Sequence, residues 1–406
     1  MPNVVFVVPF LLENTLRFVR AAQSLPGVRL GIVSQEPQDR LPNDVRQGLA
    51  GFQQVQDAMA GAPLGDGVQA LGRQLGSVES LLGILEPLQV PLAEVRERLR
   101  IRGMAAATAH NFRDKARMKQ LFEAHDIPCA RHRLCSSAAM ALQFAQELGY
   151  PLVVKPPAGA GAKTTARCDQ PQELQSFLQS VPPAPGRELL LEEFVQGREF
   201  SFDSVTLGGR HLLHNINDYH PTPLHVLQNP WIQWCVVTPR DISGPDYQAI
   251  HATGPRALTA LSMVTGMTHM EWFRRADGSI AIGEVAARPP GAQFMTLMSY
   301  VYDVDMYRAW AQLMVFETFQ PRHRVYAAGA AYLRGQGEGQ VKAIEGLEQA
   351  RSKIGALVVE ARLPQPGQAK AGSYEGEGYV IVRHPDTAVV TDALQQLVST
   401  LRVELG

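Results

Sequence analysis

The chain has 406 residues, of which 45% are hydrophobic and 19% are charged, and its formal net charge is −1. A globular protein of this length is expected to contain two to three domains. The near-zero charge argues against nucleic acid or an anionic membrane as a partner.

The N-terminus and the cysteines favour a cytoplasmic protein. The first apolar run, Val4–Leu12, is too short to span a bilayer, and no basic segment of the kind that begins a signal peptide precedes it. Four cysteines occur, and none forms a CxxC pair, so neither a zinc site nor a redox dithiol is indicated. We expect reduced thiols and a cytoplasmic location.

The first hundred residues alternate between strand and helix patterns. Asn3–Val8 and Val28–Val33 are typical of buried strands, and Glu13–Ser24 between them has helical spacing. This alternation predicts an α/β fold in which a parallel sheet carries crossover helices. We interpret Gly61–Gly67 as a loop and expect a helix over Val68–Leu85.

Three domains are predicted: residues 1–110, residues 111–320 with a lid subdomain at about 130–195, and a small α/β domain over residues 321–406. The middle domain is expected to contain helices at Asp114–His125, Ala138–Leu148, Tyr247–Val264 and Met306–Phe316, and strands at Leu152–Lys155, Glu188–Glu192, Glu199–Val205, Met267–Arg274 and Ser279–Ala287. The stretch Asp218–Pro239 looks irregular, and the chain is expected to end with a helix over Ala388–Leu401.

Two lysines stand at the ends of predicted elements. Lys115 opens a helix, and Lys155 ends an apolar strand. A lysine at the end of such a strand is expected to be partly buried, and a buried ammonium is costly unless an anion pairs with it. Phosphate oxygens and a structural carboxylate are the two candidate partners, and the residues alone leave both open.

The loop after Lys155 is rich in small residues. It contains Gly159 and Gly161, followed by Lys163 and Thr164. Small residues let backbone N–H groups approach phosphates closely. The loop fails the test for a Walker A motif because alanine replaces the glycine before Lys163. An ordinary turn is the alternative interpretation.

A pair of acids lies on two predicted strands joined by the turn signal Ala276-Asp277-Gly278. Glu271 and Glu284 are placed so that they can lie side by side across this hairpin. Two adjacent carboxylates repel each other unless a cation lies between them, so the pair predicts bound magnesium. Arg288 follows four residues later, and a plain Glu–Arg ion pair without metal is the alternative.

The order of these features resembles the ATP-grasp superfamily over about Asn111–Phe316. The run Glu284-Val285-Ala286-Ala287-Arg288 is similar to the branch that contains L-amino-acid ligases and biotin-carboxylase-like enzymes. This resemblance implies an N-terminal parallel-sheet domain, a central two-subdomain ATP-grasp domain and a small C-terminal domain.

The resemblance also implies roles for single residues. Those assigned to ATP are Lys115 and Lys155 at the phosphates, the Gly159–Thr165 loop as their cover, and Glu199 at the ribose. The segment Leu190–Val195, which includes Glu193, looks like the hinge between the two subdomains, and there Glu192 and the backbone around Val195 would face the adenine amino group. Glu271 and Glu284 match magnesium ligands, with manganese as an alternative metal, and Arg288 matches the arginine that steadies the transferred phosphate. One departure is Ala286, where many members of the superfamily have a metal-binding asparagine.

The implied activity is that of an ADP-forming ligase. A carboxylate is activated as an acyl phosphate and then attacked by an amine, so the partners are small molecules, amino acids among them, and a homodimer is expected. The alternatives are a carboxylase-type enzyme, a purine-pathway ligase and a non-catalytic ATP-binding sensor. We interpret the segment Asp218–Trp234, with His220, His225, Trp231 and Trp234, as the candidate for acceptor recognition. Packing of the tryptophans in the core is the alternative.

Overall fold

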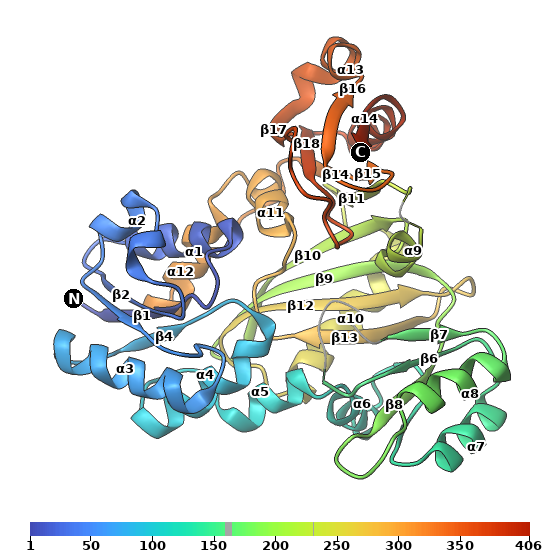
Figure 1. Ribbon diagram of the computed structural model, residues 1–406, viewed down its shortest axis with the longest axis horizontal. Coiled ribbons are helices and arrows are strands. Elements are labelled where there is room, and N and C mark those ends of the chain that lie inside the picture. The colour runs from blue at the N-terminus through green and yellow to red at the C-terminus, as the bar shows by residue number, and fades with distance from the viewer. Residues whose placement is uncertain (159–164, 230) are drawn as a thin grey trace.

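The computed structural model describes residues 1–158, 165–229 and 231–406 (Figure 1). Within these residues the strands form four sheets: a parallel sheet near the N-terminus, a long central sheet, and two smaller ones. In the same described part of the chain, every helix is too short or too polar to cross a lipid bilayer.

The N-terminal region has the predicted parallel sheet. Its strands are β1 (Asn3–Val7), β2 (Arg29–Ser34), β3 (Gly51–Gln54) and β4 (Ser80–Leu82), in the order β3-β2-β1-β4. Alternate residues of β1 face opposite sides, as strand geometry requires. One side packs against α1 (Glu13–Gln23) and α12 (Met306–Phe316), and the other packs against α3 (Gly61–Leu75) and α4 (Gln89–Leu99).

Two predictions in this region are wrong. Gly61–Gly67 is the start of α3 rather than a loop, and the segment after Leu75 contains β4 instead of a continuing helix. The glycines in α3 serve close packing, because a Cβ atom on Gly67 would lie 2.7 Å from the side chain of Val55. Gly76, at a φ of +96°, ends the helix in the left-handed region that favours glycine.

The central sheet has eight strands, joined by antiparallel pairing in the order β13-β12-β9-β10-β11-β14-β18-β17. The strands are β9 (Arg198–Leu207), β10 (Arg210–His220), β11 (Trp234–Thr238), β12 (Gly266–Arg274), β13 (Ile280–Ala286), β14 (Ala327–Leu333), β17 (Val358–Arg362) and β18 (Gly378–His384). The sheet therefore continues across the predicted boundary at residues 320–321, because β11 and β14 are hydrogen-bonded neighbours.

Helices pack along the central sheet. They are α5 (Ala106–Arg113), α6 (Lys115–Ala124), α10 (Pro245–Ala260), α11 (Phe294–Tyr302) and α14 (Thr387–Thr400). The stretch Asp218–Pro239, expected to be irregular, contains the end of β10, the short helix α9 (Pro223–Gln228) and β11. Pro223 occupies the first turn of α9, where its missing N–H leaves no hydrogen bond unmade.

A four-stranded sheet covers the residues predicted to form the lid. Its strands are β5 (His132–Cys135), β6 (Leu152–Lys155), β7 (Ala166–Cys168) and β8 (Leu189–Glu193), in the order β5-β8-β6-β7, and its helices are α7 (Ala138–Leu148) and α8 (Pro171–Ser180). Elsewhere the described chain forms the α-helices α2 (Asn43–Gln47) and α13 (Leu347–Ile354) and the strands β15 (Gly335–Gln336), β16 (Val341–Glu345) and β19 (Arg402–Leu405).

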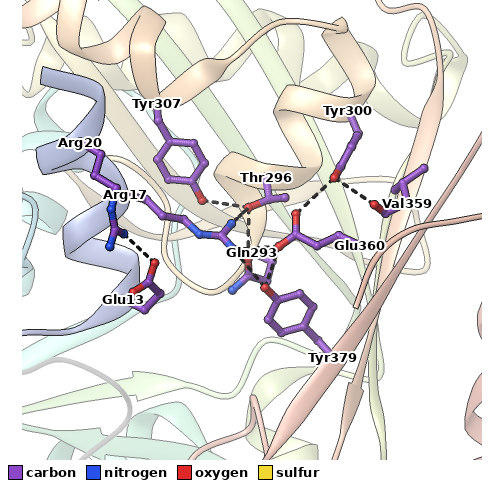
Figure 2. A network of polar contacts seen from close by, with 10 residues as sticks. All are labelled: Glu13, Arg17, Arg20, Gln293, Thr296, Tyr300, Tyr307, Val359, Glu360 and Tyr379. Carbon is purple, nitrogen blue, oxygen red and sulfur yellow. Dashed lines mark hydrogen bonds and ion pairs between the residues drawn. The ribbon is translucent and has the colours of Figure 1, made fainter. Parts of the chain in front are cut away.

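A polar network joins segments from the two ends of the chain (Figure 2). Arg17 of α1 donates hydrogen bonds to Thr296 Oγ1 at 3.0 Å and to Glu360 Oε1 at 2.8 Å. The hydroxyls of Tyr379 and Tyr300 donate to Glu360 at 2.8 Å and 3.2 Å. We call these contacts the Arg17–Glu360 network; it ties α1, α11, β17 and β18 together.

Candidate active site

A cavity of about 610 Å³ is lined by residues of the small β5–β8 sheet and of the central sheet. This volume lies within the range of small-molecule sites. It is lined by all of the predicted site residues that the structure describes, namely Lys115, Lys155, Glu192, Glu193, Val195, Glu199, Glu271, Glu284 and Arg288. The other four, Gly159, Gly161, Lys163 and Thr164, lie outside the described residues.

Lys155 ends β6 and is held by a buried acid. Its Nζ lies 2.8 Å from Glu192 Oε2 on the neighbouring strand β8, while Lys119 Nζ lies 3.3 Å from Glu192 Oε1. Burial alone would raise the pKa of Glu192, but the two lysines outweigh it and lower that pKa to about 2. Burial likewise opposes the charge of Lys155, yet the charges of Glu192 and Glu284 raise its pKa. Lys155 is therefore a fixed cation at the cavity wall.

Lys115 is placed by the start of α6. The Asp114 side chain caps the helix by accepting from the N–H groups of Ala116 and Arg117, at 2.9 and 3.0 Å. The Lys115 ammonium lies 3.1 Å from Glu284 Oε2. Lys119, which the sequence reasoning missed, follows one turn later on the same helix face, and the i, i+4 spacing was the signal that could have found it.

Acidic side chains gather on one face of the central sheet. Glu271 and Glu284 are direct partners in the β12–β13 register, as predicted from the hairpin. Along β9, Glu199 and Ser201 alternate with Phe200 and Phe202, which pack in the hydrophobic core, and Ser201 pairs with Glu271. Period two therefore brings Glu199 to the same face as Glu271.

The acids differ in how they are compensated. Burial, and then the charge of Glu284, raises the pKa of Glu271 to about 7. Burial, and then the charges of Glu271 and Glu284, raises the pKa of Glu199 well above its usual value. Burial opposes ionisation of Glu284 too, but Lys115 and Lys155 outweigh it and lower its pKa. If all of these acids were ionised, the cluster would therefore have more negative charge than the neighbouring cations neutralise.

A magnesium ion that is held partly by these carboxylates and partly by the phosphates of a bound small molecule fits this arrangement. Among the described residues, no three His, Cys, Asp or Glu side chains are grouped so as to hold a metal by themselves. Magnesium is commonly bound by one or two carboxylates together with phosphates and water. Glu271 and Glu284 supply such a pair, while Ala286 on β13 has no ligand atom to offer.

Arg288 follows β13 and pairs with an acid from the N-terminal region. Its Nη2 lies 3.4 Å from Glu86 Oε2, and Arg113 Nη1 lies 3.3 Å from the other oxygen of Glu86. In the described part of the chain, the carboxylate that pairs with Arg288 is therefore Glu86 rather than Glu284. Glu86 lines the cavity, and no sequence motif singled it out.

His269 is a second residue that the sequence reasoning did not place in the site. It stands two residues before Glu271 on β12, lines the cavity and is mostly buried. Its Nδ1 lies 2.6 Å from Asp203 Oδ1, and its Nε2 lies 3.9 Å from Glu271 Oε1. Asp203 also accepts a hydrogen bond from Asn217 at 2.7 Å. Asp203 therefore fixes the imidazole ring through Nδ1, while Nε2 is the ring nitrogen on the side of Glu271.

The segment proposed for acceptor recognition is split between cavity and surface. Trp234 is buried and lines the cavity, so it belongs both to the core and to the site. Trp231 is 63% exposed, and neither it nor His220 or His225 is among the residues that line the cavity.

Residues 120–302 match the ATP-grasp domain model. The uncharacterized protein y4rH of Sinorhizobium fredii is 24% identical over 297 residues, which is 71% of this chain and 60% of that protein. The carbamoyl phosphate synthase large chain of Thermotoga sp. is 25% identical over 56% of this chain and 20% of its own length. The D-alanine–D-alanine ligase of Pseudomonas putida is 30% identical over 126 residues, which is 31% of this chain and 36% of that protein. Each alignment spans less than two thirds of the relative.

Solved structures show the same fold. The L-amino acid ligase of Bacillus licheniformis superposes with a TM-score of 0.82 at 18% identity, over 100% of this chain and 99% of that one. The N5-carboxyaminoimidazole ribonucleotide synthetase of Thermotoga maritima gives 0.72 at 16% identity, over 100% of both. The domain match covers residues 120–302, which is less than half of the chain, and the solved structures show that the whole chain has the same fold as these enzymes.

Proposed function

We propose that the protein is an ADP-forming ligase that couples a carboxylate to an amine through an acyl phosphate. The observation that carries this proposal is the single cavity in which two lysines, an acid pair and an arginine converge. Such a set matches the charges of a nucleoside triphosphate and of a carboxylate approaching its terminal phosphate.

ATP is proposed to lie between the two sheets. Lys115 and Lys155 would pair with the α- and β-phosphates, and Lys155 is already fixed in place by Glu192. The apolar residues Ala130, Val153, Phe194 and Val195 line the same cavity and suit an adenine ring. Glu199 would accept hydrogen bonds from the ribose hydroxyls.

Glu271 and Glu284 are proposed to hold magnesium, which when bound neutralises the phosphate oxygens. Arg288 would stabilise the charge of the phosphoryl group during transfer. A carboxylate oxygen of the substrate attacks the γ-phosphorus, and the bond to the β,γ-bridging oxygen breaks to release ADP. The amine nitrogen then attacks the acyl carbon, loses a proton, and phosphate leaves. The two walls of the cavity would exclude water, which hydrolyses acyl phosphates.

Amino acids are the substrates that we propose. Support comes from the similarity to proteins that bear the names L-amino acid ligase and D-alanine–D-alanine ligase.

The proposal is tested by product analysis. The protein is incubated with ATP, magnesium and an amino-acid mixture, and the nucleotides are separated by chromatography. We expect ADP, and a hydroxamate when hydroxylamine replaces the amine. AMP as the stoichiometric product would rule out the mechanism. ADP formation that needs bicarbonate instead of an organic carboxylate would indicate a carboxylase, and ATP binding without turnover would indicate a sensor.

A further inference from the structure

Part of the cavity is lined by apolar residues that have no role in the proposed binding of ATP. The residues suited to adenine lie on or beside the small β5–β8 sheet. A second apolar group, which we call the aromatic wall, comes from the far end of β10, from α9, β11 and α11, and from the segment before β18. It consists of Tyr219, Leu224, Leu227, Trp234, Phe294 and Tyr374.

The rings of the aromatic wall support one another. The ring centroid of Trp234 lies 5.6 Å from that of Tyr219, 6.1 Å from that of Phe294 and 4.7 Å from that of Tyr374. Trp234 also stacks on buried Tyr332 at 4.8 Å, and its indole N–H donates to Pro221 O at 3.1 Å. These contacts fix the wall before any ligand arrives, so it is a preformed surface.

The aromatic wall adjoins the acids and Arg288. The ring of Phe294 lies 5.6 Å from that of His269, whose Nε2 is 3.9 Å from Glu271. Burial raises the pKa of Tyr374, and the charges of Glu375 and Glu271 raise it further, as expected for a hydroxyl near these acids. The wall therefore borders the end of the cavity where the proposed phosphoryl transfer occurs.

We propose that the carboxylate substrate carries a bulky apolar side chain, which packs against the aromatic wall while its carboxylate faces Arg288. The inference rests on the proposed function. A substrate carboxylate has to reach the γ-phosphate beside Glu271, and from there the wall is the adjacent surface. A polar side chain in the same position would lose hydrogen bonds to water without finding partners in the wall.

The test uses hydroxamate formation, in which hydroxylamine stands in for the amine and only the carboxylate varies. Leucine, methionine and phenylalanine are compared with glycine, aspartate and lysine. We expect kcat/KM to be at least about 10-fold higher for the apolar group. Equal or higher values for glycine or the charged amino acids would overturn the inference but leave the ligase standing. Absence of ADP with every carboxylate would instead remove the proposed function, and the inference with it.

A matched pair of variants on α9 tests the wall itself. Leu227 lines the cavity, whereas the next residue, Gln228, is exposed and does not. Leu227→Asn is expected to raise the KM for the preferred carboxylate about 10-fold and to leave the KM for ATP unchanged. Gln228→Asn should change neither. A normal affinity for ATP would show that the Leu227→Asn variant is folded. If this folded variant has the same KM for the carboxylate as Gln228→Asn, the inference is wrong.

Discussion

The Arg17–Glu360 network and the ionic network of the cavity are both partly buried, and they differ in how completely their charges are matched. In the Arg17–Glu360 network one cation faces one anion. The Tyr379 hydroxyl donates to the same carboxylate oxygen as Arg17, and the Tyr300 hydroxyl donates to the other. In the cavity the lysines pair with Glu192 and Glu284, whereas within the described residues no ion pair joins Glu199 to a cation.

The pKa values express the same difference. Burial opposes ionisation of Glu360, but hydrogen bonds from Arg17 and Tyr379 outweigh it and lower its pKa. Glu271 and Glu199 have raised pKa values, because burial and neighbouring acids act together on them. A network that satisfies itself stabilises the fold, whereas one with surplus charge is suited to a ligand that brings the missing cation.

The largest expected effect is the loss of turnover when one acid of the cavity network is replaced, compared with the same replacement in the Arg17–Glu360 network. Glu284→Gln should lower turnover more than ~10²-fold, because it takes one of the two carboxylates from the proposed magnesium site. Glu360→Gln is the matched control. It should leave turnover near that of the wild type and lower the free energy of unfolding by about 1–3 kcal/mol. Steady-state ADP release and urea unfolding measure the two quantities. Near-normal magnesium-dependent turnover of Glu284→Gln would place the metal elsewhere.

The second expected effect separates the two lysines that hold Glu192. Lys155 faces the cavity, whereas Lys119 is fully buried behind it and does not line the cavity. Lys155→Ala should weaken ATP binding by about 10- to 100-fold, since it removes a charge-assisted phosphate contact. Lys119→Met should mainly lower stability. Calorimetric titration with ATP checks both variants, and equal affinity of Lys155→Ala and the wild type would contradict the phosphate assignment.

The third prediction concerns stability and pH. In the unfolded chain Glu271 ionises near its usual pKa of 4.5, whereas in the fold its pKa is about 7. The folded state therefore binds more protons between these values, and this carboxyl costs stability that grows as pH rises from 4.5 and is complete above 7.

Glu271→Gln should accordingly raise the free energy of unfolding at pH 8 by about 1–2 kcal/mol without metal, after allowance for solvent screening. Adding magnesium with a non-hydrolysable ATP analogue should stabilise the wild type more than the variant. Thermal melts at pH 5 and pH 8 measure this. A variant that is less stable than the wild type at pH 8 would show that the surplus charge is not a source of strain.

The smallest expected effect is a modest strengthening of magnesium binding. Ala286→Asn adds an amide oxygen on β13 at the edge of the acid pair, and oxygen ligands suit magnesium. The magnesium concentration for half-maximal turnover should fall by about 2- to 5-fold. Magnesium titrations at saturating ATP give this value, and an increase would mean that residue 286 does not face the metal.

Much of the site was predictable because local patterns place it. The hairpin turn at Ala276–Gly278 fixes the register of Glu271 and Glu284, and period two fixes which face they share. The helices α7 and α12 match their predicted bounds, because their apolar spacing is regular. By contrast, the glycines of α3 misled the prediction, since their role is close packing and the sequence does not show what they pack against.

The sequence by itself determined the α/β class, the order of the lysines, acids and arginine, and the placement of Lys115 at a helix start and of Lys155 at a strand end. Only the tertiary structure decided that Glu86 pairs with Arg288, that Lys119 supports Glu192, and that the aromatic wall stands beside the acids. It also decided that one sheet runs from β13 to β17 across a predicted domain boundary. These facts depend on contacts between residues far apart in the chain, and period and spacing describe only neighbours along the chain.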